Sequence, residues 1–209
     1  MADRYSPRTL DMPAVILASA SRIRRELLER AGVPVQAEAA AVNEAELKAA
    51  FRAEHASAEV CAEGLAGLKA MRITASHPAA LVIGADQMLD CDGVWFDKPK
   101  DLAEARVQLL ALGGRTHRLV TAAVIVRGGE RLWHVVEAAQ LTMRRFTEDF
   151  VDAYLREAGD SVLHSVGAYQ LEALGAQLFE RVEGDFFTIL GLPLLPVLGF
   201  LRVQGVIRT

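Results

Sequence analysis

The sequence predicts an α/β fold in which helices flank a mixed β-sheet. Short apolar runs typical of buried strands alternate with segments whose apolar residues recur at helical spacing. A long stretch rich in Val, Ile and Thr, divided by Gly128-Gly129, adds an antiparallel hairpin. The chain has 209 residues, of which 52% are hydrophobic, so it can bury a sizeable core. We expect residues 1–12 to form a flexible leader and residues 13–209 to form a single domain.

The first half of the chain predicts alternating strands and helices. Residues 15–18 have the apolar character of a buried strand, and the helix that follows is capped by Ser21 and ended by Gly32. The next elements are a strand, two alanine-rich helices and a second apolar strand, expected at about 33–37, 45–54, 57–76 and 81–85. Asp86 and Gln87 then follow this last strand, at the end where ligands collect in α/β sheets.

The second half predicts a hairpin turn at Asp92-Gly93 and a capped helix from Asp101 to Leu112, ended by Gly113-Gly114. The remaining elements are two long hairpin strands, a helix capped by Thr147, two short strands and a closing helix. We expect them at 117–126, 132–143, 147–158, near Ala168, at 177–182 and from about Leu192.

Charge and composition exclude several classes of protein. The 23 Lys and Arg against 27 Asp and Glu give a net charge of -4, without the broad basic surface that nucleic acids or anionic membranes require. The longest uncharged stretch, residues 186–201, contains two prolines and is too short to span a membrane. Cys61 and Cys91 have neither a C-x-x-C motif nor a nearby His, so we predict no disulfide or zinc site and a cytoplasmic location.

The first candidate site joins the first strand to the first helix. Ser19 and Ser21 offer hydroxyl groups, and Arg24 offers a guanidinium group, near the N-terminus of the helix. Free backbone N–H groups, the helix dipole and an arginine are together suited to a phosphate. For Arg24, a solvated position on the helix surface is an equally good interpretation, and for Arg25 it is the better one.

Asp86 is the second candidate, because a carboxylate after an apolar strand is well placed as a metal ligand or a general base. A turn or helix cap is the alternative, but Gly84 indicates a close approach to the backbone, and we favour a functional role. Lys98 and Glu44 are weaker candidates. Taken alone, Lys98 is better explained as a surface lysine before a helix, and the alternative for Glu44 is an ordinary solvated side chain.

Three further polar residues stand apart from these candidates. Glu172 is an isolated carboxylate, and Arg115, before a predicted strand, is a candidate third cation for a phosphate site besides Arg24 and Lys98. His117 is better explained as a packed or surface residue than as an acid or a ligand. The chain has no P-loop, dinucleotide fingerprint, G-x-S-x-G or H-E-x-x-H motif.

Taken in order, the motifs of this chain resemble those of the Maf family of nucleoside triphosphate pyrophosphatases. The matching segments are Ile16 to Leu28, Gly84-Ala85-Asp86, Lys98-Pro99, Leu112 to His117, Gly167-Ala168-Tyr169, Glu183-Gly184-Asp185 and Leu190 to Leu194. The resemblance implies a Maf/ITPase-like α/β fold with two lobes around a nucleotide-binding cleft. It also implies hydrolysis of the α–β phosphate bond with a divalent metal, Mg²⁺ or Mn²⁺, and it leaves a homodimer open.

The resemblance also assigns roles to individual residues. Asp86 matches the general base, and Glu44 matches an acidic position linked to activity or metal binding, so either carboxylate is a candidate metal ligand. Ser19, Ser21, Arg24 and Lys98 match residues near the phosphates and, like Glu44, are expected to bind substrate.

Three positions predict which base is accepted. Pyrimidine-type members of the family carry Arg, Thr and Gln where this chain has Ile23, Gln87 and Glu172, and the match is instead to the 7-methyl-GTP branch. A carboxylate suits guanine because it accepts hydrogen bonds from N1–H and the exocyclic amine, and it attracts a base made cationic by N7 methylation.

The chain departs from the family pattern at four further positions, which are Arg22, Asp97, Ser165 and Ala173. Asp97 replaces a Gly and adds negative charge beside Lys98. Two other functions stay open at this point: a nucleotide-binding regulator of cell division with little turnover, and a phosphatase that releases orthophosphate.

Overall fold

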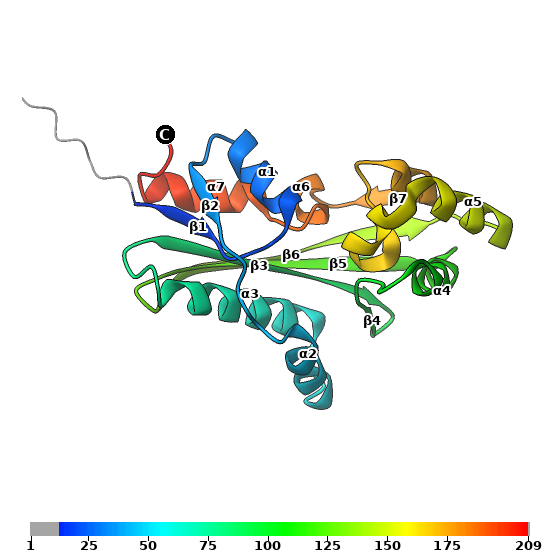
Figure 1. Cartoon of the computed structure of the whole chain (residues 1–209), viewed down its shortest axis with the longest axis horizontal. Helices are drawn as coiled ribbons and strands as arrows, with labels where there is room; N and C mark the ends of the chain where they lie inside the picture. The colour runs from blue at the N-terminus through cyan, green and yellow to red at the C-terminus, as the bar shows by residue number, and fades with distance from the viewer. Residues whose placement is uncertain (1–12, 209) are drawn as a thin grey trace, which may run out of the picture.

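The computed structural model describes residues 13–208, so the predicted leader lies outside the described residues. Its centre is a seven-stranded sheet in the order β2-β1-β3-β5-β6-β7, with β4 paired to β3 (Figure 1). The strands are β1 (Val15–Leu17), β2 (Val35–Ala37), β3 (Leu81–Cys91), β4 (Val94–Phe96), β5 (Thr116–Arg127), β6 (Glu130–Met143) and β7 (Phe179–Glu183).

Seven α-helices accompany the sheet within the described residues. They are α1 (Arg22–Arg30), α2 (Glu44–Ala53), α3 (Ala58–Thr74), α4 (Leu102–Leu112), α5 (Glu148–Ala158), α6 (Phe186–Ile189) and α7 (Leu194–Val203). Three 3-10 helices lie between α5 and β7, namely η1 (Gly159–His164), η2 (Val166–Ala168) and η3 (Leu174–Leu178). The predicted caps form, since the side chains of Ser21, Asp101 and Thr147 each accept a backbone N–H bond.

The sheet is mixed, which confirms the predicted fold class. β1 pairs in parallel with both β2 and β3, and the connections between these strands contain α1, α2 and α3, as parallel neighbours require. All other pairs are antiparallel, and the β5–β6 hairpin turns at Gly128-Gly129 as predicted.

β3 is longer than the sequence predicts, and this changes the position of Asp86. The strand continues to Cys91, so Asp86 and Gln87 lie inside it and do not follow it. The reason is a change of partner: β1 pairs with β3 only as far as Ile83, whereas β5 pairs with it up to Asp90. Asp86 therefore lies just beyond the end of the parallel part of the sheet, beside an open edge.

One other prediction near the C-terminus is wrong, and one element there was not predicted. The segment around Ala168 is a 3-10 turn and not a strand, because Gly167 and Ala168 both have positive φ angles, 77° and 61°, which a strand cannot contain. The short helix α6, capped by Asp185, was not expected, and the closing helix begins at Leu194.

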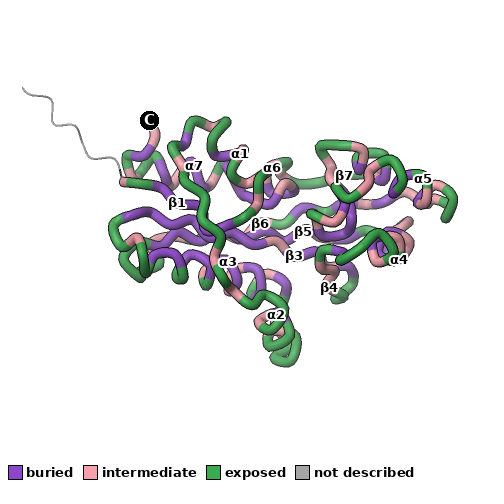
Figure 2. Tube along the Cα trace, in the orientation of Figure 1, coloured by how far each residue is buried: buried purple, intermediate pink, exposed green. Residues whose placement is uncertain are grey.

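Helices cover both faces of the sheet, and the long strands are buried between them (Figure 2). Along β3 and β5 alternate residues belong to different cores, because successive strand residues point to opposite faces. One core packs against α3, and the second packs against α1 and α7 on the other face. A third core lies toward α4 and α5, at the other end of the long strands (Figure 1). These cores form two lobes that share β3, β5 and β6.

One glycine determines how closely α3 approaches the sheet. A Cβ atom at Gly84 would lie 1.9 Å from the carbonyl oxygen of Ala66 and 2.9 Å from the backbone nitrogen of Ala70. No larger residue fits without a shift of the backbone, which confirms the predicted close approach. The contact brings Lys69 of α3 beside Asp86.

Among the described residues, no helix has both the length and the apolar character needed to cross a lipid bilayer.

Candidate active site

A cleft of about 1250 Å³ lies where β1 ends and the two lobes face each other. This volume is large enough for a nucleotide. The structure brings all of the site residues predicted from the sequence to this one cleft: Ser19, Ser21, Ile23, Arg24, Glu44, Asp86, Gln87, Lys98 and Glu172. Asp86 and Gln87 reach it from opposite faces of β3, because the edge of that strand is open at this point.

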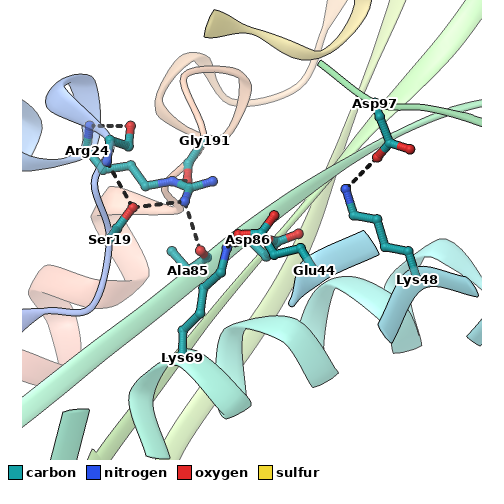
Figure 3. A network of polar contacts seen from close by, with 10 residues as sticks. Ser19, Arg24, Glu44, Lys48, Lys69, Ala85, Asp86, Asp97 and Gly191 are labelled. Atoms are coloured by element: carbon teal, nitrogen blue, oxygen red, sulfur yellow. Dashed lines mark hydrogen bonds and ion pairs between the residues drawn. The ribbon is translucent and has the colours of Figure 1, made fainter. Parts of the chain in front are cut away.

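The loop between β1 and α1 is held in place by its own hydroxyl groups. The Ser19 side chain accepts a hydrogen bond from the backbone N–H of Ser21 at 3.1 Å, and the Ser21 side chain caps α1 by accepting from the N–H of Arg24. Ser19 also accepts a hydrogen bond from the Arg24 guanidinium group at 3.4 Å. The two serines therefore fix the loop that presents Arg24 to the cleft (Figure 3).

Arg24 is a half-buried cation held by backbone carbonyl groups, and not a solvated residue of the helix surface. Its Nε donates to the carbonyl oxygen of Gly191 at 2.7 Å, and its Nη1 donates to the carbonyl oxygen of Ala85 at 2.8 Å. Burial lowers the pKa of Arg24, whereas the charges of Asp86 and Glu44 raise it. Its hydrogen bonds go to carbonyl and hydroxyl oxygens, so its positive charge is not neutralised by a direct carboxylate contact.

Lys69 joins the two acidic residues of the site (Figure 3). Its Nζ lies 2.5 Å from Asp86 Oδ1 and 2.7 Å from Glu44 Oε1, and its side chain is only 9% exposed. Partial burial opposes the charge of Glu44, but the hydrogen bond from Lys69 and the charges of Lys69, Lys48 and Lys98 lower the pKa of Glu44 below its usual value. Glu44 is therefore ionised at neutral pH.

The second oxygen of Asp86 is left without a partner. Asp86 Oδ2 is buried and makes no hydrogen bond, while Oδ1 is occupied by Lys69. A buried carboxylate oxygen without a partner is costly unless a ligand, a metal or a water binds it. In this position it can accept a proton from a water molecule in the cleft.

The carboxylates are consistent with a divalent cation that is held jointly with a substrate. Among residues 13–208, no group of three or more His, Cys, Asp or Glu side chains could hold a metal. Mg²⁺, however, is commonly bound through one or two carboxylates together with substrate phosphates. Asp86, with its free Oδ2, and Glu44 supply such a pair.

The other end of the cleft is less charged. Ile23, Tyr169 and Ile189 line it, together with the exposed carboxylate of Glu172. Tyr169 is fixed by a 2.7 Å hydrogen bond to Nε2 of the buried His117.

Gln87 contributes to this part of the cleft mainly by holding the backbone of α6. Its side-chain amide lies 2.9 Å from Thr121 Oγ1 and donates to the carbonyl oxygens of Thr188 and Ile189 at 3.0 and 3.1 Å. The donor group of Gln87 is thus used to hold α6 against the sheet.

Three polar residues do not join the site as charged groups. Arg115 pairs with Asp92 at 2.5 Å and does not line the cleft, so the prediction of a third phosphate cation there is wrong. His117 is a packed core residue, as predicted, and burial lowers its pKa to about 4. Arg25 is on the helix surface, 3.6 Å from Glu29, also as predicted.

The cleft residues that sequence reasoning missed include Lys48, Lys69 and Tyr169. Lys69 could have been found from its spacing, because it lies four residues after Leu65 and three after Ala66, on the buried face of α3. A lysine on an apolar helix face needs a buried partner. Lys48 and Tyr169 offer no comparable pattern.

Comparison with known proteins shows the family of this chain. A nucleoside triphosphate pyrophosphatase of Paramagnetospirillum magneticum is 60% identical over 91% of this chain and 98% of that protein. A similarly named protein of Granulibacter bethesdensis is 55% identical over 90% of this chain and 95% of that protein. The 7-methyl-GTP pyrophosphatase of Rhizobium etli is 49% identical over 93% and 98%. The family model described as Maf-like protein matches residues 14–204, and the chain therefore belongs to the Maf family.

Proposed function

We propose that this chain is a nucleoside triphosphate pyrophosphatase, which hydrolyses the bond between the α- and β-phosphates and releases a monophosphate and pyrophosphate. One observation carries the proposal: a buried carboxylate with a free oxygen, Asp86, lies in a nucleotide-sized cleft among Arg24, Lys69 and Lys98. The names of the similar proteins support the same reaction.

In this mechanism Asp86 Oδ2 accepts a proton from the water that attacks the α-phosphate. Lys69 holds Asp86 Oδ1, so the carboxylate is fixed in direction while Oδ2 faces its target. Arg24 and Lys98 offset the negative charge of the phosphates, which is the main requirement of phosphoryl transfer. Pyrophosphate leaves with the electron pair of the broken anhydride bond.

A divalent cation, Mg²⁺ or Mn²⁺, is part of the proposal. When bound, it would add positive charge at the phosphates. While Asp86 Oδ2 acts as the base, Glu44 would hold the cation together with the substrate phosphates, and Lys69, which contacts both carboxylates, keeps them in place.

We further propose that the preferred substrate is a modified purine nucleotide resembling 7-methyl-GTP. Glu172 lies in the same cleft as the phosphate-binding residues, and a carboxylate there can accept from both donors of a guanine edge. The positive charge of a 7-methylated base adds an attraction that uracil or thymine lacks. Proteins of Rhizobium etli and Rhizobium meliloti, 49% and 47% identical to this chain, carry the name 7-methyl-GTP pyrophosphatase.

Product analysis tests the reaction. The purified protein is incubated with Mg²⁺ and a panel of triphosphates, and pyrophosphate and orthophosphate are measured separately. We expect pyrophosphate, and we expect Asp86→Asn to abolish its release while the far-ultraviolet circular dichroism spectrum is unchanged. Release of orthophosphate alone would indicate a phosphatase, and no turnover of any nucleotide that binds would indicate a regulatory protein.

A comparison of substrates tests the base preference. We expect kcat/KM for 7-methyl-GTP to exceed that for UTP, and Glu172→Gln to narrow the difference about tenfold, the effect of one hydrogen bond to a charged group. Glu130→Gln makes the same change at the far end of the β5–β6 hairpin and serves as the matched control. Faster turnover of UTP by the unaltered protein would refute the preference.

A further inference from the structure

Helix α2 is attached to the rest of the protein in part through a buried lysine. Its single buried residue is a lysine, Lys48, while most of the helix is exposed. Lys48 Nζ lies 2.6 Å from Asp97 Oδ1 (Figure 3), and Nη2 of Arg52, one turn later, lies 3.5 Å from Asp97 Oδ2. Two cations of one helix thus hold a single carboxylate on the segment between β4 and α4.

Asp97 is also fixed from the other side. The amide of Gln108, a buried residue of α4, donates to the backbone carbonyl oxygen of Asp97 at 3.0 Å. The guanidinium group of Arg52 stacks over Trp95, on β4, at 5.2 Å from the ring centroid. Both the side chain and the backbone of Asp97 are therefore held.

The residue fixed by these contacts immediately precedes Lys98. Lys98 is exposed at the cleft, and within residues 13–208 its side chain makes no hydrogen bond or ion pair that would fix its position. Glu44, the first residue of α2, is held separately by Lys69 at 2.7 Å. The contacts around Asp97 thus act mainly on Lys98.

The charges of this group explain why an aspartate is tolerated beside a phosphate site. Partial burial opposes ionisation of Asp97, but the hydrogen bond from Lys48 and the charges of Lys48 and Arg52 lower the pKa of its carboxyl group. One negative and two positive charges leave the group with a net charge of +1. The charge beside the cleft therefore stays positive at this position.

We propose that Lys48, Arg52 and Asp97 form a clamp in which Asp97 is a positioning residue for Lys98, the lysine expected to bind the phosphates. This inference rests on the proposed function. A solvent-exposed ion pair would contribute little, but here the Lys48 side chain is only 10% exposed and its partner adjoins a residue of the site. Asp97, which stands where the family has glycine, is then a replacement that required Lys48 and Arg52 as partners.

Steady-state kinetics of pyrophosphate release test the clamp, with whichever triphosphate the unaltered protein turns over fastest. The variants are Lys48→Met, Lys48→Arg, Asp97→Asn, Lys98→Met and the double variant Lys48→Met/Lys98→Met. Asp152→Asn is the matched control, because it neutralises the partner of Arg106 in a 2.6 Å ion pair outside the cleft. Thermal unfolding is measured for each variant to identify losses that come from unfolding.

If Asp97 positions Lys98, both Lys48→Met and Asp97→Asn raise KM about tenfold and change kcat less than about threefold, since a displaced lysine weakens binding of the phosphates. Lys48→Arg keeps KM within about threefold, because arginine preserves the charge-assisted bond. The double variant is no worse than Lys98→Met alone, because the clamp acts through Lys98.

The Asp97→Asn variant distinguishes a role of Asp97 in positioning Lys98 from a role in repelling the phosphates. If Asp97 only repelled the phosphates, its neutralisation would lower KM, and that result would overturn the proposal. The proposal would also be overturned if Lys48→Met left KM unchanged, or if the increases in KM of the two single variants multiplied in the double variant. Failure of the proposed function is distinct, because then the unaltered protein itself releases no pyrophosphate.

Discussion

Replacement of Lys69 by Met tests the buried charge arrangement of the site most directly. Methionine has a similar length and an apolar character, so it fills the space but leaves Asp86 with neither of its oxygens bonded. Asp86 is 4% exposed and so gains almost no water in compensation, whereas the Glu44 side chain is 46% exposed and is readily solvated. The cost therefore falls on Asp86.

The size of the effect follows from this asymmetry. Removing one partner of a buried ion pair destabilises a protein by about 3–5 kcal/mol, chiefly because a buried charge is left uncompensated. Only one of the two carboxylates is deeply buried here, so we expect a loss near the lower end, about 3 kcal/mol. The double variant Lys69→Met/Asp86→Asn has no such charge, and it should recover at least half of that loss.

Urea unfolding followed by circular dichroism measures both variants against the unaltered chain. Pyrophosphate release should be lost in both, since each removes the fixed carboxylate. A Lys69→Met protein within about 0.5 kcal/mol of the unaltered one, the range of ordinary surface substitutions, would refute the reasoning. So would a double variant that is less stable than Lys69→Met.

Three other substitutions have defined outcomes. Gly84→Ala places a Cβ 1.9 Å from the carbonyl oxygen of Ala66, so we expect at least about 3 kcal/mol of destabilisation in urea unfolding, at the upper end for overpacking. Arg24→Lys cannot reproduce the bonds at 2.7 and 2.8 Å to two carbonyl oxygens, and kcat/KM should fall about tenfold or more while the melting temperature changes little. Burial lowers the pKa of His117 to about 4, so the unfolded chain binds a proton at this residue before the folded chain does as the pH falls below about 6.5. Neutral His117 therefore contributes up to about 3 kcal/mol of stability, which is fully present above pH 6.5 and lost by about pH 4. His117→Gln should flatten the plot of unfolding free energy against pH between these values.

Local features of the fold could be predicted from the sequence. The caps at Ser21 and Thr147 and the turn at Asp92-Gly93 depend on neighbouring residues only, and the structure contains each of them. The alternation of apolar strands with helical patterns also predicted the α/β class correctly, because the hydrophobic period of each segment is a local property of the sequence.

Features that depend on distant partners could not be predicted in this way. β3 contains Asp86 and Gln87, two polar residues that end an apolar pattern. Their partners are distant in the sequence: Lys69 for Asp86, and Thr121, Thr188 and Ile189 for Gln87. The turn at Ala168 requires a positive φ angle in a residue that rarely adopts one.

In the candidate site too, the residues that local motifs mark could be predicted, whereas their contacts with distant segments could not. The motifs located the loop at Ser19, the carboxylate of Asp86 and the lysine at position 98, all of which line the cleft. They did not indicate that Arg24 binds the backbone of Gly191, or that Arg115 pairs elsewhere. These are contacts between segments far apart in the chain, and no local pattern records them.

The three strands shared by both lobes have a consequence for how a nucleotide binds. β3, β5 and β6 continue from one lobe into the other, so paired strands and not a single flexible loop join the two walls of the cleft. Residues on both walls are thus held by one hydrogen-bonded sheet. Part of the entropy of ordering the binding site is therefore lost during folding and need not be lost again when a nucleotide binds.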